Sequence, residues 1–99
     1  MSQEKGFTYY TDPAHGWVCV TLDDLRSVGL KASDFTLYSY RNGNELYLEE
    51  DCDAMKFIYH WNEKYKEPPL FYEQHIPTTE NFIRKFPHND ARAALGYFA

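Results

Sequence analysis

The sequence lacks the motifs by which most small enzymes and metalloproteins are recognised. Its 99 residues hold two cysteines, Cys19 and Cys52, and no Cys-x-x-Cys, His-x-x-x-His or calcium-loop pattern, so neither a disulfide framework nor a metal site is predicted. No nucleophile elbow is present, and spacing alone brings none of the four histidines to a serine or a thiol. We therefore expect a protein that uses no cofactor and is not an enzyme.

Long apolar runs and an excess of positive charge are missing too. No stretch is long and apolar enough to span a bilayer, and no apolar signal segment stands at the start of the chain. This predicts a cytoplasmic protein with reduced thiols and no membrane contact. The 10 Lys and Arg are outnumbered by 15 Asp and Glu, which gives a formal net charge of −5. That charge argues against attraction to a nucleic-acid backbone, so nucleic acid is not the expected partner.

Aromatic residues, by contrast, are abundant. Nine Tyr, seven Phe and two Trp make up 18% of a chain that has room for one domain, which we assign to residues 1–99. One small core does not easily bury so many large side chains, and Tyr suits a surface that is half apolar and half wet. We therefore expect some rings to be exposed or to be buried by a partner.

Periodicity and turn residues predict an α+β fold. The expected elements, in chain order, are strand 16–21, helix 22–28, strands 36–41 and 44–49, helix 53–67 and strand 70–76. This β-α-β-β-α-β order predicts a two-layer sandwich, ferredoxin-like or related, in which an antiparallel sheet carries both helices on one face. Residues 1–15 show no sustained period and are expected to form a loose segment. Residues 78–99 are expected to form a tail that packs on the domain, with an extended piece at 81–86 and a helical turn from 89 or 90 to 95.

The clearest local signal is the pair Asn42-Gly43, which favours a two-residue type I′ turn. With that turn, Tyr38 lies opposite Tyr47 in a hairpin. Side chains alternate between the two faces of a sheet, so one face would be mainly leucine and the other mainly tyrosine. The leucine face, which we expect to meet the core, would hold Leu37, Ser39, Leu46 and Leu48.

The tyrosine face is the predicted interaction site. Exposed clusters of large rings usually mark an interaction surface, and Tyr and Trp dominate binding energy in interfaces. The candidate interface consists of Trp17, Tyr38, Tyr40, Glu45, Tyr47, Glu49 and Glu50. Its carboxylates admit two interpretations, a solvated strand face or complementarity to a basic partner. An alternative also stays open for the rings, which the N-terminal segment or the C-terminal tail, with Phe82, Phe86 and Phe98, would cover by folding back.

Several short motifs resemble a family of small phage, prophage and plasmid proteins. The runs Tyr38-Ser-Tyr-Arg-Asn-Gly43 and Tyr47-Leu-Glu-Glu-Asp-Cys-Asp53 carry the resemblance, and His15-Gly-Trp-Val18 and Asn81-Phe-Ile-Arg84 are compatible with it. The similarity spans residues 12–86. The family has no assigned activity, so the resemblance implies a setting, that of a mobile-element accessory protein in a bacterial cytoplasm, and no functional residue.

Three functions follow as hypotheses. The first is a phage-type accessory protein that binds a host or phage protein stoichiometrically through the candidate interface, for example to inhibit a host defence or nucleic-acid-processing protein. The second is a module that stacks single-stranded nucleic acid on the rings of the sheet face. The third is a homodimer that buries the aromatic face.

Overall fold

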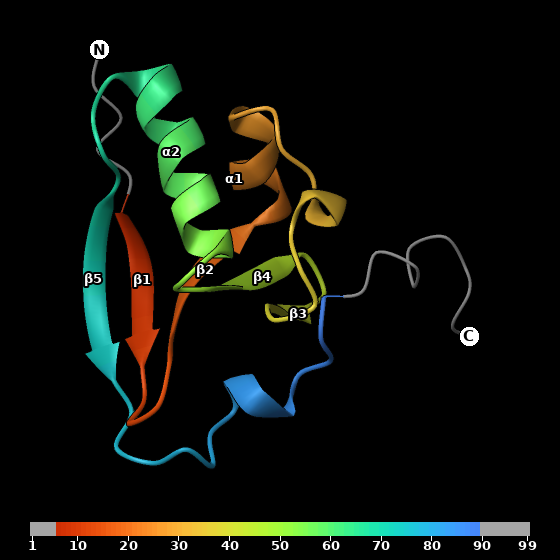
Figure 1. Ribbon diagram of the computed structural model, residues 1–99, viewed down its shortest axis with the longest axis vertical. Coiled ribbons are helices and arrows are strands. Elements are labelled where there is room, and N and C mark those ends of the chain that lie inside the picture. The colour runs from red at the N-terminus through yellow and green to blue at the C-terminus, as the bar shows by residue number, and fades with distance from the viewer. Residues whose placement is uncertain (1–5, 90–99) are drawn as a thin grey trace.

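The computed structural model describes residues 6–89, which form an α+β fold with a five-stranded mixed sheet and two helices. The elements are β1 (Gly6–Thr11), β2 (Gly16–Thr21), α1 (Leu22–Ser27), β3 (Tyr40–Asn42), β4 (Glu45–Glu49), α2 (Asp53–Tyr65) and β5 (Leu70–His75), with 3-10 turns at Ala32–Asp34 and Ile83–Lys85. The strands lie side by side in the order β3-β4-β2-β1-β5. Both helices lie on one side of the sheet, and the segment after β5 passes over the other (Figure 1).

Strand β1 overturns the predicted topology. Residues 6–11, expected to be part of a loose segment, form a strand that lies between β2 and β5 and pairs with β5 in parallel. The sheet is therefore mixed rather than antiparallel, and its order is not that of a ferredoxin-like fold. Phe7 and Tyr9 lie on one face of β1 and Tyr10 on the other. Because both faces carry aromatic rings, the alternation of apolar and polar residues that marks a half-buried strand is absent from this segment.

The face toward the helices is a continuous apolar core, as predicted for a sheet with both helices on one face. The buried residues of this core are Phe7, Val18, Val20, Leu25, Val28, Leu30, Phe35, Leu46, Leu48, Ala54, Phe57 and Trp61. Helix α1 begins at the predicted capping box, in which the Asp24 amide donates to Thr21 Oγ1 at 3.1 Å and the Thr21 amide donates to the Asp24 carboxylate at 2.8 Å. Helix α2 contributes Ala54, Phe57 and Trp61, and the ring of Phe57 meets that of Phe7 edge to face.

The hairpin between β3 and β4 turns one residue later than predicted. Asn42 pairs with Glu45 and Tyr40 with Tyr47, so the central residues are Gly43 and Asn44. Only Gly43, with φ 61°, has a positive φ in this turn, which is the pattern of a type II′ rather than a type I′ turn. The pairing thus slides by two residues, and Tyr40 and Tyr47 keep their predicted face because a two-residue shift preserves the alternation. Leu37 and Tyr38 fall outside the strand, and Leu37 is exposed rather than part of the core.

Residues 76–89, the described part of the chain after β5, pack on the sheet, and their local structure differs from the expected one. The piece at 81–86, expected to be extended, contains the 3-10 turn Ile83–Lys85. Further along, the Arg41 amide donates to the Pro87 carbonyl and the Asn89 amide to the Ser39 carbonyl, both at 2.8 Å. The outer edge of β3 is therefore covered. The helical turn expected near the end of the chain lies outside the described residues, apart from Asn89. Neither helix found between residues 6 and 89 has the length and apolar character needed to cross a membrane.

Candidate functional site

The aromatic face, by which we mean Tyr10, Trp17, Cys19, Tyr40 and Tyr47 on the side of the sheet away from the helices, is largely covered. Phe86 lies against Tyr47 with ring centroids 5.3 Å apart, and Phe82 meets Tyr10 edge to face at 5.5 Å. Tyr47 is only 5% exposed and Trp17 only 2%. The predicted open face of tyrosines is therefore wrong, and the alternative, in which the C-terminal tail folds over the rings, is the arrangement found.

The covering segment, residues 76–89, is held down by a buried carboxylate. The side chain of Asp12 is fully buried and accepts two hydrogen bonds from Arg84, from Nε at 2.8 Å and Nη2 at 3.2 Å. It also accepts from Asn81 Nδ2 at 3.0 Å and from the amides of Ala14 and His15, each at 2.8 Å. The Arg84 guanidinium, with help from these other donors and against the effect of burial, holds the pKa of Asp12 well below its usual range. Asp12 thus ties the turn before β2 to the 3-10 turn that crosses the aromatic face.

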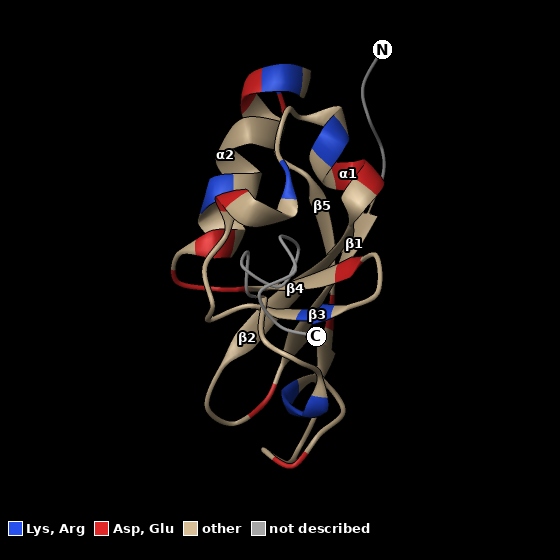
Figure 2. Ribbon diagram, turned by 90° about the vertical axis from the view of Figure 1, so that its right-hand side faces the viewer, with Lys and Arg blue, Asp and Glu red and all other residues tan. Residues whose placement is uncertain are grey.

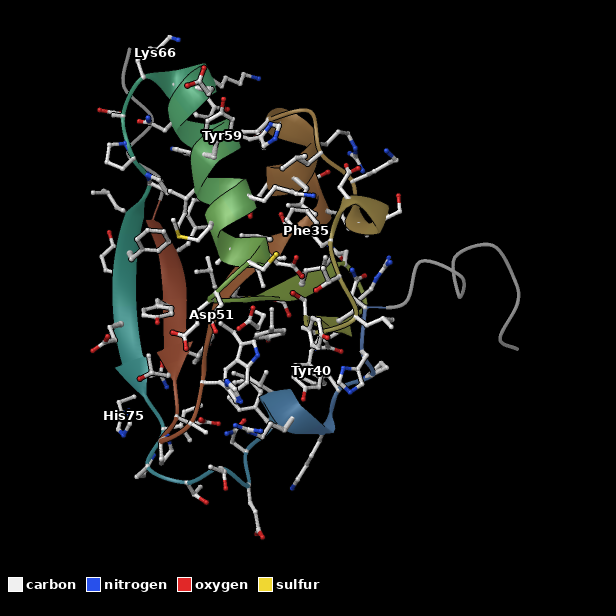
Figure 3. All side chains as sticks on the ribbon, viewed as in Figure 1. Phe35, Tyr40, Asp51, Tyr59, Lys66 and His75 are labelled. Carbon is white, nitrogen blue, oxygen red and sulfur yellow. The ribbon has the colours of Figure 1, made fainter. Side chains whose placement is uncertain are left out.

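One end of the aromatic face remains open as a pocket of about 410 Å³. It lies where the turn before β2, the start of β3, the connection between β4 and α2, and the covering segment meet. The lining residues are His15, Trp17, Tyr38, Tyr40, Glu49, Asp51, Cys52, Arg84 and His88. Tyr40 reaches this region from β3 and Asp51 from the connection between β4 and α2 (Figure 3).

The walls of the pocket are aromatic rings in fixed contact. Tyr40 meets Trp17 edge to face, with centroids 6.1 Å apart, and His88 stacks on Tyr40 at 4.6 Å. His88 is itself oriented by a contact of 2.8 Å between its Nδ1 and the carbonyl of Leu37. The guanidinium of Arg84 lies over the Trp17 ring at 5.3 Å. Because these rings support one another, the pocket has its shape before any partner arrives.

The charges around the pocket do not balance. The Glu49 carboxylate accepts a hydrogen bond from the Cys52 amide at 3.2 Å. No ion pair within residues 6–89 includes Glu49 or Asp51. The positive charge of Arg84 is already opposed by Asp12. The connection between β4 and α2 is acidic, and the basic turn Ile83–Lys85 lies apart from it (Figure 2). Within residues 6–89, the side of the pocket formed by that connection therefore carries negative charge that no ion pair compensates.

The structure divides the predicted interface residues between four places. Trp17, Tyr38, Tyr40 and Glu49 line the pocket, whereas Tyr47 is buried beneath Phe82 and Phe86. Glu45 lies farther along β4, where its carboxylate faces the Cys19 thiol at 3.8 Å.

Glu50, also a predicted interface residue, lies on the helix side of the sheet, where it accepts a hydrogen bond from the Tyr9 hydroxyl at 2.6 Å. Burial of the hydroxyl, together with this carboxylate, raises the pKa of Tyr9 to about 12. Glu45 and Glu50 are therefore not part of the pocket.

Sequence reasoning missed five lining residues: His15, Asp51, Cys52, Arg84 and His88. Their spacing matches no ligand or catalytic pattern, so periodicity could not have found them. One signal was present, because each of the four short runs singled out in the sequence, 15–18, 38–43, 47–53 and 81–84, contributes to the lining. His15 and Trp17 come from the first, Tyr38 and Tyr40 from the second, Glu49, Asp51 and Cys52 from the third, and Arg84 from the fourth.

The lining of the pocket consists of aromatic rings and charged side chains. Among the residues described, no group of three or more His, Cys, Asp or Glu side chains is placed to hold a metal ion. What the pocket does offer is π faces next to two carboxylates, a combination that binds cations. Comparisons of the chain with protein-family models, with curated proteins and with solved structures found no match.

Proposed function

We propose that this protein acts by stoichiometric binding of another protein, and that the pocket, with Tyr38 in its wall, is the binding surface. The setting implied by the resemblance is a phage-type mobile element whose accessory protein works in the bacterial cytoplasm. The partner in that setting is a host or phage protein, and inhibition of a host defence or nucleic-acid-processing protein is the outcome that the setting favours.

The observation that carries the proposal is the exposure of Tyr38. Its side chain is 73% exposed beside the pocket, yet its backbone is firmly placed. The Tyr38 amide donates to Thr36 Oγ1 at 3.2 Å, and Thr36 in turn donates through its amide and hydroxyl to the buried Asp53, at 2.9 and 2.8 Å. A large ring presented from an ordered backbone loses little entropy on binding, which is typical of the residues that dominate interfaces.

The chemistry of the pocket favours a basic side chain as the partner's anchor. An Arg or Lys that enters would meet the rings of Tyr38 and Tyr40 and the carboxylates of Glu49 and Asp51. Cation–π contact and a charge-assisted hydrogen bond reinforce one another where water is partly excluded. The partner surface would therefore present an exposed Arg or Lys within an otherwise apolar patch.

The test is capture from a host lysate with matched variants. We expect Tyr38→Ala and Glu49→Gln each to lose a protein that the unchanged chain retains. Tyr59→Ala serves as the control, because Tyr59 is 62% exposed on α2, away from the pocket. Native mass spectrometry of the purified pair should then give equal numbers of the two chains. Retention of the same proteins by all variants would reject this surface.

The alternative of a single-stranded nucleic-acid module has weaker support. It requires open rings on the sheet face, but Tyr47 and Trp17 are covered by residues 76–89. Fluorescence anisotropy with labelled single strands at low salt distinguishes the two functions, since a nucleic-acid module binds strongly there and weakens as salt is added.

A further inference from the structure

Strand β5 has no neighbour on its outer side within residues 6–89. It is the last strand in the order β3-β4-β2-β1-β5, and all six of its residues are exposed. Leu70, Phe71 and Tyr72 are among the exposed large apolar side chains. Natural edge strands are commonly blunted by lysine, proline or a covering segment. Leu70–His75 contains no lysine or proline, and the covering segment protects the opposite edge, at β3.

The outward backbone groups of β5 can be identified from its contact with β1. The Ile76 amide donates to the Thr11 carbonyl at 2.7 Å, so the backbone groups of residue 76 point toward β1. These groups alternate along a strand. The amides and carbonyls of Phe71, Glu73 and His75 therefore point away from the sheet, where no other strand of residues 6–89 pairs with them.

The charge pattern of β5 is self-complementary in an antiparallel pair. Glu73 and His75 share one face, with one residue between them. If two copies of β5 pair with Gln74 opposite Gln74, each Glu73 lies opposite His75 of the second copy. Both residues then use their outward backbone groups, which closes four backbone hydrogen bonds. Centring the pair on Glu73 instead would place two glutamates directly opposite each other, which is unfavourable.

The surroundings of β5 suit this register. His75 Nδ1 lies 2.9 Å from Thr11 Oγ1, which leaves Nε2 to face outward toward a carboxylate. Helix α2 lies beside the first half of β5, whereas the end of the strand, where Figure 3 labels His75, lies away from both helices (Figures 1 and 3). A second copy centred on Gln74 therefore approaches the part of the edge that no helix borders.

We propose that a second copy of this chain pairs with β5 in antiparallel orientation, with Gln74 on the two-fold axis, and so extends the sheet across two protomers. This dimer uses the edge opposite to the one that borders the pocket, and it leaves the aromatic face uncovered by the partner. It therefore does not depend on the proposed function, and failure of either proposal leaves the other standing. Because the ladder is short, we expect a dissociation constant of about 100 µM for this dimer.

Cysteine cross-linking tests the register. Gln74→Cys in a Cys52→Ser background should form a disulfide-linked dimer on oxidation, because directly opposite residues of a non-hydrogen-bonded pair have Cα atoms about 4.5 Å apart, within the range of a disulfide. The matched variants Tyr72→Cys and Glu73→Cys should cross-link at least tenfold more slowly. Equal rates in all three, or a faster rate at position 72 or 73, would overturn the register.

An exchange of charges tests the pairing without any cross-link. By sedimentation equilibrium, His75→Glu should weaken the dimer about tenfold, since it sets glutamate against glutamate twice. The double variant Glu73→His, His75→Glu should restore the original association, because an antiparallel two-fold pair keeps the exchanged charges opposite each other. Circular dichroism checks that each variant is folded. A protein that stays monomeric at millimolar concentration, or a double variant no better than His75→Glu, would reject the proposal.

Discussion

The two faces of the sheet are closed by different means. The helix face is a continuous apolar core to which β1, β2, β4, α1 and α2 all contribute. The aromatic face is covered by a segment that has little regular structure and is tied down through Asp12, Arg84 and Asn81. The helix face is thus held by packing spread over many residues, whereas the aromatic face is closed by fewer apolar contacts, by backbone hydrogen bonds at the β3 edge and by one buried carboxylate. The aromatic face leaves the pocket lined by Glu49 and Asp51 at one end, and we expect the two faces to respond differently to mutation.

The largest expected effect is on the helix face. Phe57 is fully buried and meets the rings of Phe7 and Trp61 with centroids 5.2 and 5.8 Å away. Phe57→Ala should therefore lower the free energy of unfolding by about 3–5 kcal/mol, because it removes apolar burial and leaves a cavity. Urea unfolding followed by circular dichroism measures this loss. Tyr59→Ala, an exposed change on the same helix, should cost less than about 0.5 kcal/mol.

On the aromatic face the largest effect should come from Asp12. Asp12→Asn retains an oxygen that can accept the amides of Ala14 and His15, but it loses the charge that Arg84 requires. We expect the free energy of unfolding at neutral pH to fall by about 2 kcal/mol. If the loss equalled that of Phe57→Ala, the contrast drawn between the two faces would be wrong.

The contribution of Asp12 to the free energy of unfolding should depend on pH, and Asp12→Asn tests this. The pKa of Asp12 is lower in the folded chain than in the unfolded chain, so the folded state binds this proton more weakly. The stabilisation is complete above the unfolded pKa of about 4 and is lost as the pH falls below it toward the folded pKa. Asp12→Asn cannot titrate there, so the difference in unfolding free energy between the two proteins should shrink between pH 5 and pH 2, values that bracket the unfolded pKa of about 4. Urea titrations across this range measure it.

Cys19 offers a more local probe of the covered face. Its thiol packs under the covering segment, and burial with the nearby Glu45 carboxylate raises its pKa to about 11. Cys52 is exposed. A thiol reagent should therefore label Cys52 quickly and Cys19 slowly, and Asp12→Asn should accelerate only the labelling of Cys19 if the segment opens by itself. Equal acceleration at both cysteines would indicate global unfolding instead. Mass spectrometry of the labelled peptides separates the two rates.

The smallest effect on stability should come from Tyr38. Its ring is exposed and adds little to either face, so Tyr38→Ala should change the free energy of unfolding by less than about 0.5 kcal/mol. The same substitution is expected to abolish partner capture. A large loss of stability would mean that Tyr38 supports the fold, and its exposure would then say little about binding.

The fold was predictable where local spacing and boundary residues were sufficient. The capping box at Thr21, helix α2 and strand β5 were found from the sequence, since each is set by local spacing and by Gly or Pro boundaries. Strand β1 was missed because rings on both of its faces hide the alternation. The turn at Gly43 was misplaced by one residue because Asn42-Gly43 and Gly43-Asn44 are both acceptable turn pairs, and local propensity does not choose between them.

The site was predictable in its residue types and not in its geometry. Trp17, Tyr38, Tyr40 and Glu49 were named from their aromatic or acidic character, and the structure brings all four to the pocket. Arg84 and His88 reach the pocket only because the chain folds back over the sheet. The contacts that hold the folded-back segment span 72 residues between Asp12 and Arg84 and 51 residues between Leu37 and His88.

By itself the sequence determined the α+β class, the opposite faces of Leu46 and Tyr47 on β4 and the surplus of rings, because periodicity and composition act over neighbouring residues. Only the tertiary structure decided which rings are buried, which charge is compensated and which strand edge is left open. These three features depend on contacts between segments that lie far apart in the sequence. A local sequence pattern does not determine which distant segments meet.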